Sequence, residues 1–314
     1  MIRFPGFIDI CTDIPHDGWE KISRTALQCG YTSLIASPLP NEVFTEKADV
    51  HLAMEEPSGQ AACDYAKIAA ITPENIRTVG DWADEVPAAL LDFSIFDSSG
   101  SFARMNLLSR LFTRWPANKP ICLRGNANHI GSALFMGQVH KKKIHICSVS
   151  SRAVIELISE ARKEGVSVSC DMHPLSLLFS SDGKNPAGML SHLGTEDDRQ
   201  ALWRHFGEID CFSSAGYVSR RGDSAEALKI MLPLLFSMLK SEMLTTEDIF
   251  RRCCLNPAKI FGIRLDPSTS IEIEDEPSGM RIRSVRLRGQ TVYSADPSEV
   301  SAKPRSEQLK GFSA

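Results

Sequence analysis

A few cysteine, carboxylate and histidine side chains at the ends of short apolar runs could bind a metal ion. Cys11 and Asp13 directly follow the run Phe7–Ile10 and are chemically possible zinc ligands. Three further side chains could lie near the same edge: Asp92, Asp171 and His173. No C-x-x-C or H-E-x-x-H spacing accompanies them. The pattern therefore favours a buried Cys11 and acidic side chains that face loops or pair with Arg124.

Hydroxyl and imidazole groups give little support for nucleophilic catalysis. Ser213, Ser214 and the segment 148–151 offer hydroxyls, but no histidine and aspartate accompany them as an evident relay. His145 lies inside an apolar run, which indicates a packed, hydrogen-bonded histidine. No glycine-rich dinucleotide motif or P-loop follows any apolar run, which argues against nucleotide-binding folds of those kinds.

Composition narrows the class of protein further. The chain has 314 residues, of which 43% are hydrophobic, and a formal net charge of −4. This charge gives no case for nucleic acid or an anionic membrane as a partner. The nine cysteines show no paired spacing, which suggests reduced thiols. With no signal-like start and no long apolar stretch, we expect a soluble cytoplasmic protein, with the nucleus as an alternative location.

Short apolar runs alternate with amphipathic stretches along most of the chain. Eight runs are candidate strands: Phe7–Ile10, Ser33–Ser37, Lys67–Ile71, Ala88–Phe93, Ile121–Leu123, Ile144–Cys147, Val166–Cys170 and Ile209–Phe212. Most are continuous rather than alternating, which is typical of parallel strands covered on both faces. Helix starts are indicated at Thr72, Ser151, Thr195 and Thr245. The sequence therefore predicts an α/β protein with a (β/α)8 TIM barrel, and an open doubly wound sheet stays as the alternative.

The C-terminal part of the chain changes character. The segment 268–277 is acidic and rich in turn residues, and Arg281–Tyr293 alternates apolar with basic residues as an edge strand or hairpin does. Beyond it the sequence becomes polar and rich in serine, proline and lysine. We expect a barrel with a C-terminal strand segment over residues 1–297, and a flexible linker or tail over residues 298–314.

The scaffold segments carry a resemblance to a known family. They are FPGFIDI at Phe4–Ile10, CDYA at Cys63–Ala66, IHIC at Ile144–Cys147, ALW at Ala201–Trp203, IDCFSS at Ile209–Ser214, MLPLLF at Met231–Phe236 and NPAKIFG at Asn256–Gly262. From about Arg3 to Tyr293 the chain resembles dihydroorotase, a zinc-dependent enzyme of the amidohydrolase superfamily. The resemblance is strongest to the dihydroorotase domain of the animal fused pyrimidine-pathway protein, and it implies the same barrel fold.

The departures from the family pattern fall on its chemistry. The family's metal-binding histidines fall on Cys11, Asp13, Arg124 and Ser148. Its carboxylated, metal-bridging lysine falls on Leu90, and its aspartate that binds metal and moves a proton falls on Ala215. Its substrate-binding arginine and asparagine fall on Pro15 and Leu39, and a further histidine falls on Gly216. The family reaction needs two cations to activate water, and neither leucine nor alanine can bind one.

The resemblance therefore implies a pseudoenzyme without cofactor or metal. The inactive dihydroorotase-like domain of the fungal fused pyrimidine protein is the analogue, and it lies between carbamoyl-phosphate synthetase and aspartate transcarbamoylase domains. We expect a scaffold role beside those two domains of the same polypeptide, and a homodimer. Two alternatives stay open, a metal-dependent amidohydrolase with a rewired site and a small-molecule sensor. Without metals we expect a filled cavity in which Arg124 pairs with Asp13 or Asp92.

Overall fold

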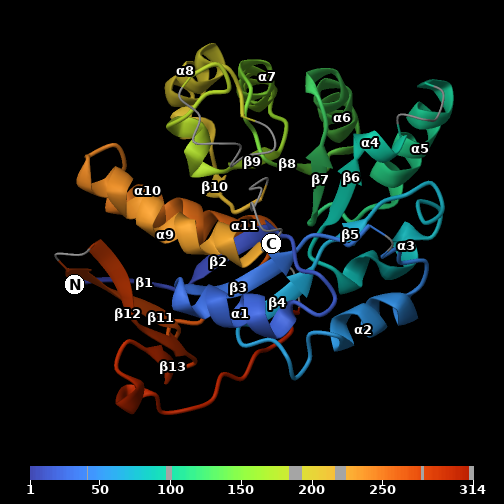
Figure 1. The fold of residues 1–314 in the computed structure, drawn as a ribbon. Helices are drawn as coiled ribbons and strands as arrows, with labels where there is room; N and C mark the ends of the chain where they lie inside the picture. Colours follow the sequence, from blue (N-terminus) through green and yellow to red (C-terminus); the bar gives the residue numbers. More distant parts are fainter. Residues whose placement is uncertain (41, 97–100, 184–192, 216–223, 277–278, 311–314) are drawn as a thin grey trace.

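A barrel of eight parallel strand positions forms the centre of the molecule (Figure 1). A computed structural model describes the chain except for residues 41, 97–100, 184–192, 216–223, 277–278 and 311–314. The barrel strands are β2 (Phe7–Thr12), β3 (Tyr31–Ala36), β4 (Asp64–Lys67) continued by β5 (Ala69–Ala70), β6 (Ala89–Asp92), β7 (Pro120–Arg124), β8 (Lys143–Ile146), β9 (Val168–Met172) and β10 (Cys211–Phe212). Each predicted run overlaps one of these positions, so the (β/α)8 fold is confirmed.

Helices cover the outside of the barrel. They are α1 (Trp19–Gln28), α2 (Lys47–Glu55), α3 (Val79–Trp82), α4 (Phe93–Phe96), α5 (Ser101–Arg114), α6 (Ala127–His140), α7 (Arg152–Lys163), α8 (Glu196–Arg204) and α9 (Ser224–Lys240). Ser151 caps α7, because its hydroxyl accepts from the backbone N–H of Val154. Thr195 forms a capping box with Asp198, so the motif is complete although Asp stands where Glu or Gln is usual.

The floor of the barrel, at the N-terminal ends of its strands, is closed by the last helices. Thr245 caps α10 (Thr246–Phe250), a π-helical turn follows, and α11 (Asn256–Phe261) ends at Gly262, whose φ is +66°. Phe261 and Ile263 join the apolar interior of the barrel together with Ile8 and Ile10. The interior is therefore a packed core.

Two sequence predictions outside the barrel are wrong. Residues after Thr72 form a turn instead of a capped helix, because the Asn75 side chain accepts from the Thr72 N–H and donates to the Ala70 carbonyl. The acidic segment expected to be turns forms strand β11 (Ser270–Glu276). Its Ile271 and Ile273 are buried between more exposed acidic residues, so the alternation of a half-buried strand outweighs the charge.

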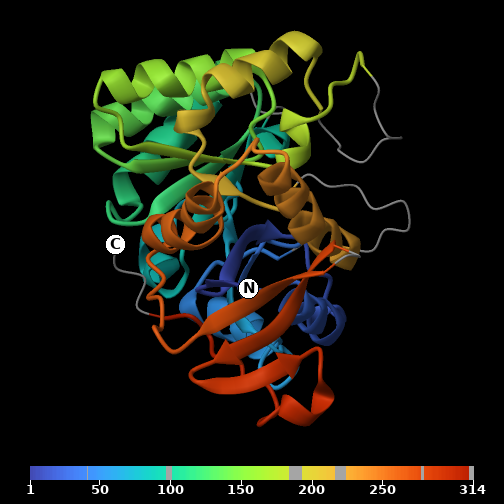
Figure 2. The ribbon, with the colours of Figure 1, turned by 90° about the vertical axis from the view of Figure 1, so that its left-hand side faces the viewer.

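A second sheet joins the two ends of the chain. Its order is β1 (Ile2–Phe4), β11, β12 (Gly279–Leu287) and β13 (Gln290–Ser294), all antiparallel, and this confirms the predicted hairpin. Figure 2 shows this sheet, with its C-terminal strands in red, at the end of the molecule away from α7 and α8. Within the described part of the chain, no helix is both long enough and apolar enough to span a bilayer.

Part of the predicted tail contacts the barrel. Tyr65 of β4 donates its N–H to the Glu307 carbonyl and accepts from the Leu309 N–H. Nη1 of Arg288 lies 2.9 Å from Oδ2 of Asp64, and the Asp64 carboxylate also accepts a hydrogen bond from the Glu307 N–H. Leu309 packs against the apolar interior of the barrel. The expected boundary between residues 297 and 298 stays a prediction.

Candidate functional site

The C-terminal ends of the barrel strands bring five of the singled-out residues to one rim, where barrel enzymes carry their chemistry. A bulge between Ile10 and Thr12 gives Cys11 a φ of +57° and buries it in the barrel interior. Its Sγ lies 3.8 Å from the Sγ of Cys147. The hydrogen bond to Cys147 and burial raise the pKa of the Cys11 thiol well above its usual value.

The other rim positions lack metal ligands. Leu90 and Ala215 are 5% and 4% exposed and pack in the apolar barrel interior. Arg124 lies with Nη1 3.6 Å from Oδ2 of Asp92, which confirms the predicted ion pair with one of its two expected partners. Ser148 has a φ of +56°, and its backbone N–H donates to Asp171.

Three singled-out positions lie away from this interior. Asp13 and Pro15 are exposed, and Leu39 is half-buried with its N–H near the Glu42 carboxylate. Gly216 lies outside the described residues. The structure thus does not bring Asp13 to Cys11 as a pair of metal ligands.

Asp9 anchors one buried polar network that the sequence analysis missed. It is fully buried and accepts from the Thr12 hydroxyl and from both the N–H and the hydroxyl of Ser214, which joins the first barrel strand to the residues after the last. Burial raises the pKa of Asp9 to about 6, while the hydrogen bonds from Ser214 and Thr12 act in the opposite direction. The sequence signal for this network was the charged Asp9 inside the apolar run FIDI, because a buried carboxylate needs hydrogen-bond donors.

Asp171 anchors a second network. It accepts from the Ser213 hydroxyl and lies 3.0 Å from Nε2 of His145, whose Nδ1 lies 2.9 Å from the Ser169 hydroxyl. The carboxylate stands between hydroxyl and imidazole, so His145 cannot act as a base on Ser213. The interpretation of His145 as a packed, hydrogen-bonded residue is confirmed.

The described residues include one group of possible metal ligands. The sequence analysis did not bring these residues together. Donor atoms of His145, Cys147 and Asp171 all lie within 4.8 Å of one another, and all three residues are buried. His173, an earlier candidate, instead accepts from the Leu175 N–H, and burial lowers the pKa of its imidazole to about 3. His173 is therefore a neutral structural side chain.

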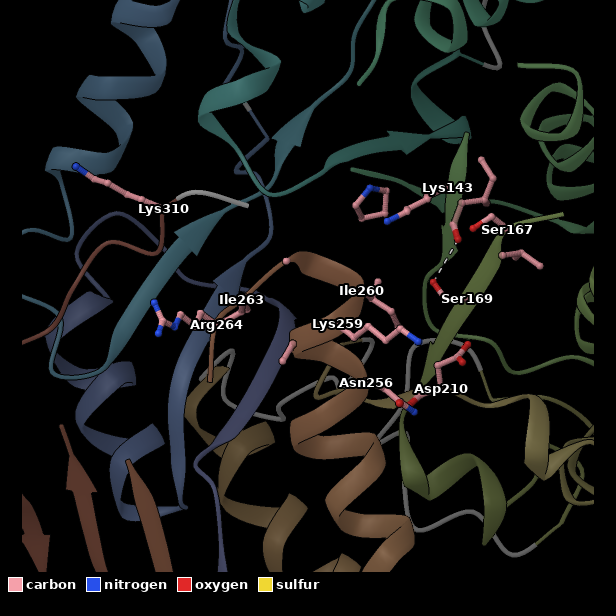
Figure 3. Close-up of a pocket in the computed structure, with 15 residues that line it drawn as sticks. Lys143, Ser167, Ser169, Asp210, Asn256, Lys259, Ile260, Ile263, Arg264 and Lys310 are labelled. Atoms are coloured by element: carbon pink, nitrogen blue, oxygen red, sulfur yellow. Dashed lines mark hydrogen bonds between the residues drawn. The ribbon is translucent and has the colours of Figure 1, made fainter. Parts of the chain in front are cut away.

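A cavity of about 740 Å³ lies at the other end of the barrel. Its lining includes Pro120 and Lys143, the first residues of β7 and β8, and residues of α11 (Figure 3). None of the eight described positions where the family's functional residues fall lines it.

Comparison with known proteins gives relatives over nearly the whole chain. No family model matches it. The multifunctional protein pyrABCN of Emericella nidulans is 30% identical over 288 residues, which is 88% of this chain and 12% of that protein. The multifunctional protein CAD of Squalus acanthias is 27% identical and covers 93% of this chain. The chain is a homologue of the dihydroorotase region of CAD-like multifunctional pyrimidine proteins.

Solved structures show the same barrel fold. The inactive dihydroorotase-like domain of the Chaetomium thermophilum CAD-like multifunctional protein superposes with a TM-score of 0.86 at 22% identity, over 98% of this chain and 99% of that one. An L-hydantoinase from Arthrobacter aurescens superposes with a TM-score of 0.81 at 16% identity, over 99% of this chain and 89% of that one. The dihydroorotase-like chain spans 12% to 15% of the multifunctional relatives it matches first.

Proposed function

We propose that the dihydroorotase-like chain is a non-catalytic domain with a structural role in a multifunctional pyrimidine-synthesis protein. One observation carries this proposal. At the positions that correspond to the family's bridging lysine and proton-transferring aspartate, Leu90 and Ala215 pack in the apolar interior. Arg124 replaces a metal-binding histidine and pairs with Asp92.

The chemistry of the rim supports the proposal. A hydrolase of this kind needs two cations that lower the pKa of a bridging water and polarise the amide carbonyl. The guanidinium of Arg124 adds a fixed positive charge where a cation would sit. Asp9 and Asp171 already accept hydrogen bonds from protein donors, which occupy lone pairs that a cation would otherwise bind.

The relatives suggest the setting. We infer that the domain lies beside carbamoyl-phosphate synthetase and aspartate transcarbamoylase domains of the same polypeptide and holds them in place. We also propose that it pairs with a second copy as a homodimer. All nine cysteines are free and buried, which supports a reducing compartment such as the cytoplasm.

The test is an assay of the purified chain for interconversion of carbamoyl aspartate and dihydroorotate, with and without added zinc, together with elemental analysis. We expect no turnover and no stoichiometric zinc. Leu90→Lys alone should not restore activity, because metal ligands and substrate contacts act as a unit. Turnover that persists through repurification and scales with protein concentration would contradict the proposal.

A metal-dependent hydrolase is the second candidate, and the grouping of His145, Cys147 and Asp171 favours it. If elemental analysis finds one zinc per chain, His145→Gln and Cys147→Ser should both release it, and His205→Gln is the matched control away from the group. Zinc retained in all three variants would place the ion elsewhere and remove this candidate.

A further inference from the structure

Four basic side chains border the cavity at the floor of the barrel. Lys143 begins β8, Lys259 belongs to α11, Arg264 follows that helix, and Lys310 belongs to the C-terminal segment. Figure 3 shows Lys259 extending toward strands β8 and β9, while Arg264 and Lys310 lie on the other side of the cavity. Lys143 and Lys259 thus share one side of the cavity, whereas the charged ends of Arg264 and Lys310 point away from them in Figure 3.

Lys143 and Lys259 have no ion-pair partner among the described residues. Arg264 helps to lower the pKa of Asp266, and Lys310 also borders a neighbouring pocket that Glu55 and Glu85 line. The acidic residue that lines the cavity, Asp210, already receives the guanidinium of Arg162 at 2.5 Å and the Cys170 N–H. Elsewhere on the surface, basic side chains commonly lie beside carboxylates, as Arg152 does with Asp197. The cavity therefore concentrates positive charge in a chain whose formal net charge is −4.

The cavity also offers apolar surface and neutral polar groups. Ile144, Val168 and Ile263 line it, and so do Ser167 and Asn256. The Asn256 amide donates to the Asp210 carbonyl, which fixes the side chain beside the space. A volume of about 740 Å³ is within the range of small-molecule sites and accommodates a ligand of nucleotide size.

We propose that this cavity binds a small phosphorylated molecule, with its phosphate on the side of Lys143 and Lys259 and its organic part against the apolar wall. Ammonium and guanidinium groups bind phosphate oxygens through charge-assisted hydrogen bonds, and a phosphate carries more negative charge than a single carboxylate. The site lies at the end of the barrel opposite to the family's catalytic rim, so it does not depend on the proposed loss of catalysis.

The experiment is titration calorimetry on the full chain at low ionic strength, with ADP, pyrophosphate and uncharged adenosine as probes. We expect ADP and pyrophosphate to bind, and adenosine to bind at least about tenfold more weakly, with affinity falling as salt rises. Lys143→Gln and Lys259→Gln should each weaken ADP binding roughly threefold, and the double variant about tenfold. Thermal unfolding without ligand confirms that each variant is folded.

Two control variants locate the binding. Lys229→Gln removes an exposed lysine outside the cavity, and Arg124→Gln removes the cation at the catalytic rim; both should leave ADP affinity unchanged. Three results would overturn the proposal: no binding of ADP or pyrophosphate, equal affinity for adenosine, or binding that is lost in Arg124→Gln and kept in the double lysine variant.

Discussion

Two buried carboxylates in the barrel, Asp9 and Asp171, each accept hydrogen bonds from hydroxyl and N–H donors of the protein. Asp9 receives three hydrogen bonds from Thr12 and Ser214. Asp171 accepts hydrogen bonds from the Ser213 hydroxyl and the Ser148 N–H, and it lies against His145. These networks tie neighbouring strands together, so the polar residues of the interior contribute to the fold.

The raised pKa of Asp9 predicts a pH dependence of stability. Its pKa is about 6 in the folded chain against 3.8 as the ordinary value. The folded state therefore favours the protonated acid, and the stabilisation present below pH 4 is lost as the pH rises through 6, by about 3 kcal/mol at most. Asp9→Asn stays neutral and should flatten this fall.

Urea unfolding of the wild type and Asp9→Asn between pH 4 and 7 measures the effect. The difference between the two unfolding free energies removes the contribution of all other titrating groups. Asp13→Asn, at an exposed position, is the control and should run parallel to the wild type. If the unfolding free energy of Asp9→Asn also ran parallel to that of the wild type, the pKa of Asp9 would not be raised in the folded chain.

Sequence reasoning at single residues succeeded where side-chain type decides the outcome. Leu90 packs in the interior and Arg124 pairs with Asp92, as apolar bulk and opposite charge require. The contact of Cys11 with Cys147 could not be foreseen, because one bulged residue changes the face to which a strand residue points.

At the scale of elements, the continuous apolar runs predicted the barrel strands well, since burial on both faces leaves a strong local signal. The second sheet was harder to predict. It pairs Ile2 with Ile273 and so depends on a contact between opposite ends of the chain. Strand β11 also carries the acidic residues that made it resemble a turn.

A buried ion cluster fixes the end of β4. Lys67 is 2% exposed, and its Nζ lies 2.7 Å from Glu42 and 2.6 Å from Glu56. Lys67→Met should lower the unfolding free energy by about 3 kcal/mol, because two carboxylates then face each other without a cation. Lys47→Met, which removes an exposed pair with Glu85, should cost less than about 1 kcal/mol. Equal losses measured by urea unfolding would contradict this explanation.

The C-terminal segment tests where the folded unit ends. Deletion of residues 301–314 removes the backbone pairing with Tyr65 and the Leu309 contact, and should cost about 2 kcal/mol while the barrel stays folded. Glu307→Gln keeps the pairing and weakens only the contact with Arg288, so its effect should be smaller. Circular dichroism and urea unfolding check both variants. Loss of folding on deletion would place the domain boundary beyond residue 297.

At the scale of the whole molecule, one helix face is open to a partner. Phe135 and Val139 of α6 are 62% and 57% exposed and lie one turn apart on the same face. Large apolar side chains exposed together are typical of interaction surfaces. Soluble homo-oligomers most often form closed twofold pairs, in which such a face meets its own copy.

We therefore predict that the isolated chain forms a dimer through α6. Light scattering across a concentration series should give twice the monomer mass, and Phe135→Glu should shift the equilibrium to monomer, because burying a carboxylate at a twofold contact places two like charges together. Leu52→Glu is the matched control, since Leu52 is equally prominent on α2, at 66% exposed, but lies on another face. A strict monomer at every concentration would remove self-association from the proposed structural role. A dimer disrupted by Leu52→Glu and not by Phe135→Glu would move the contact from α6 to α2.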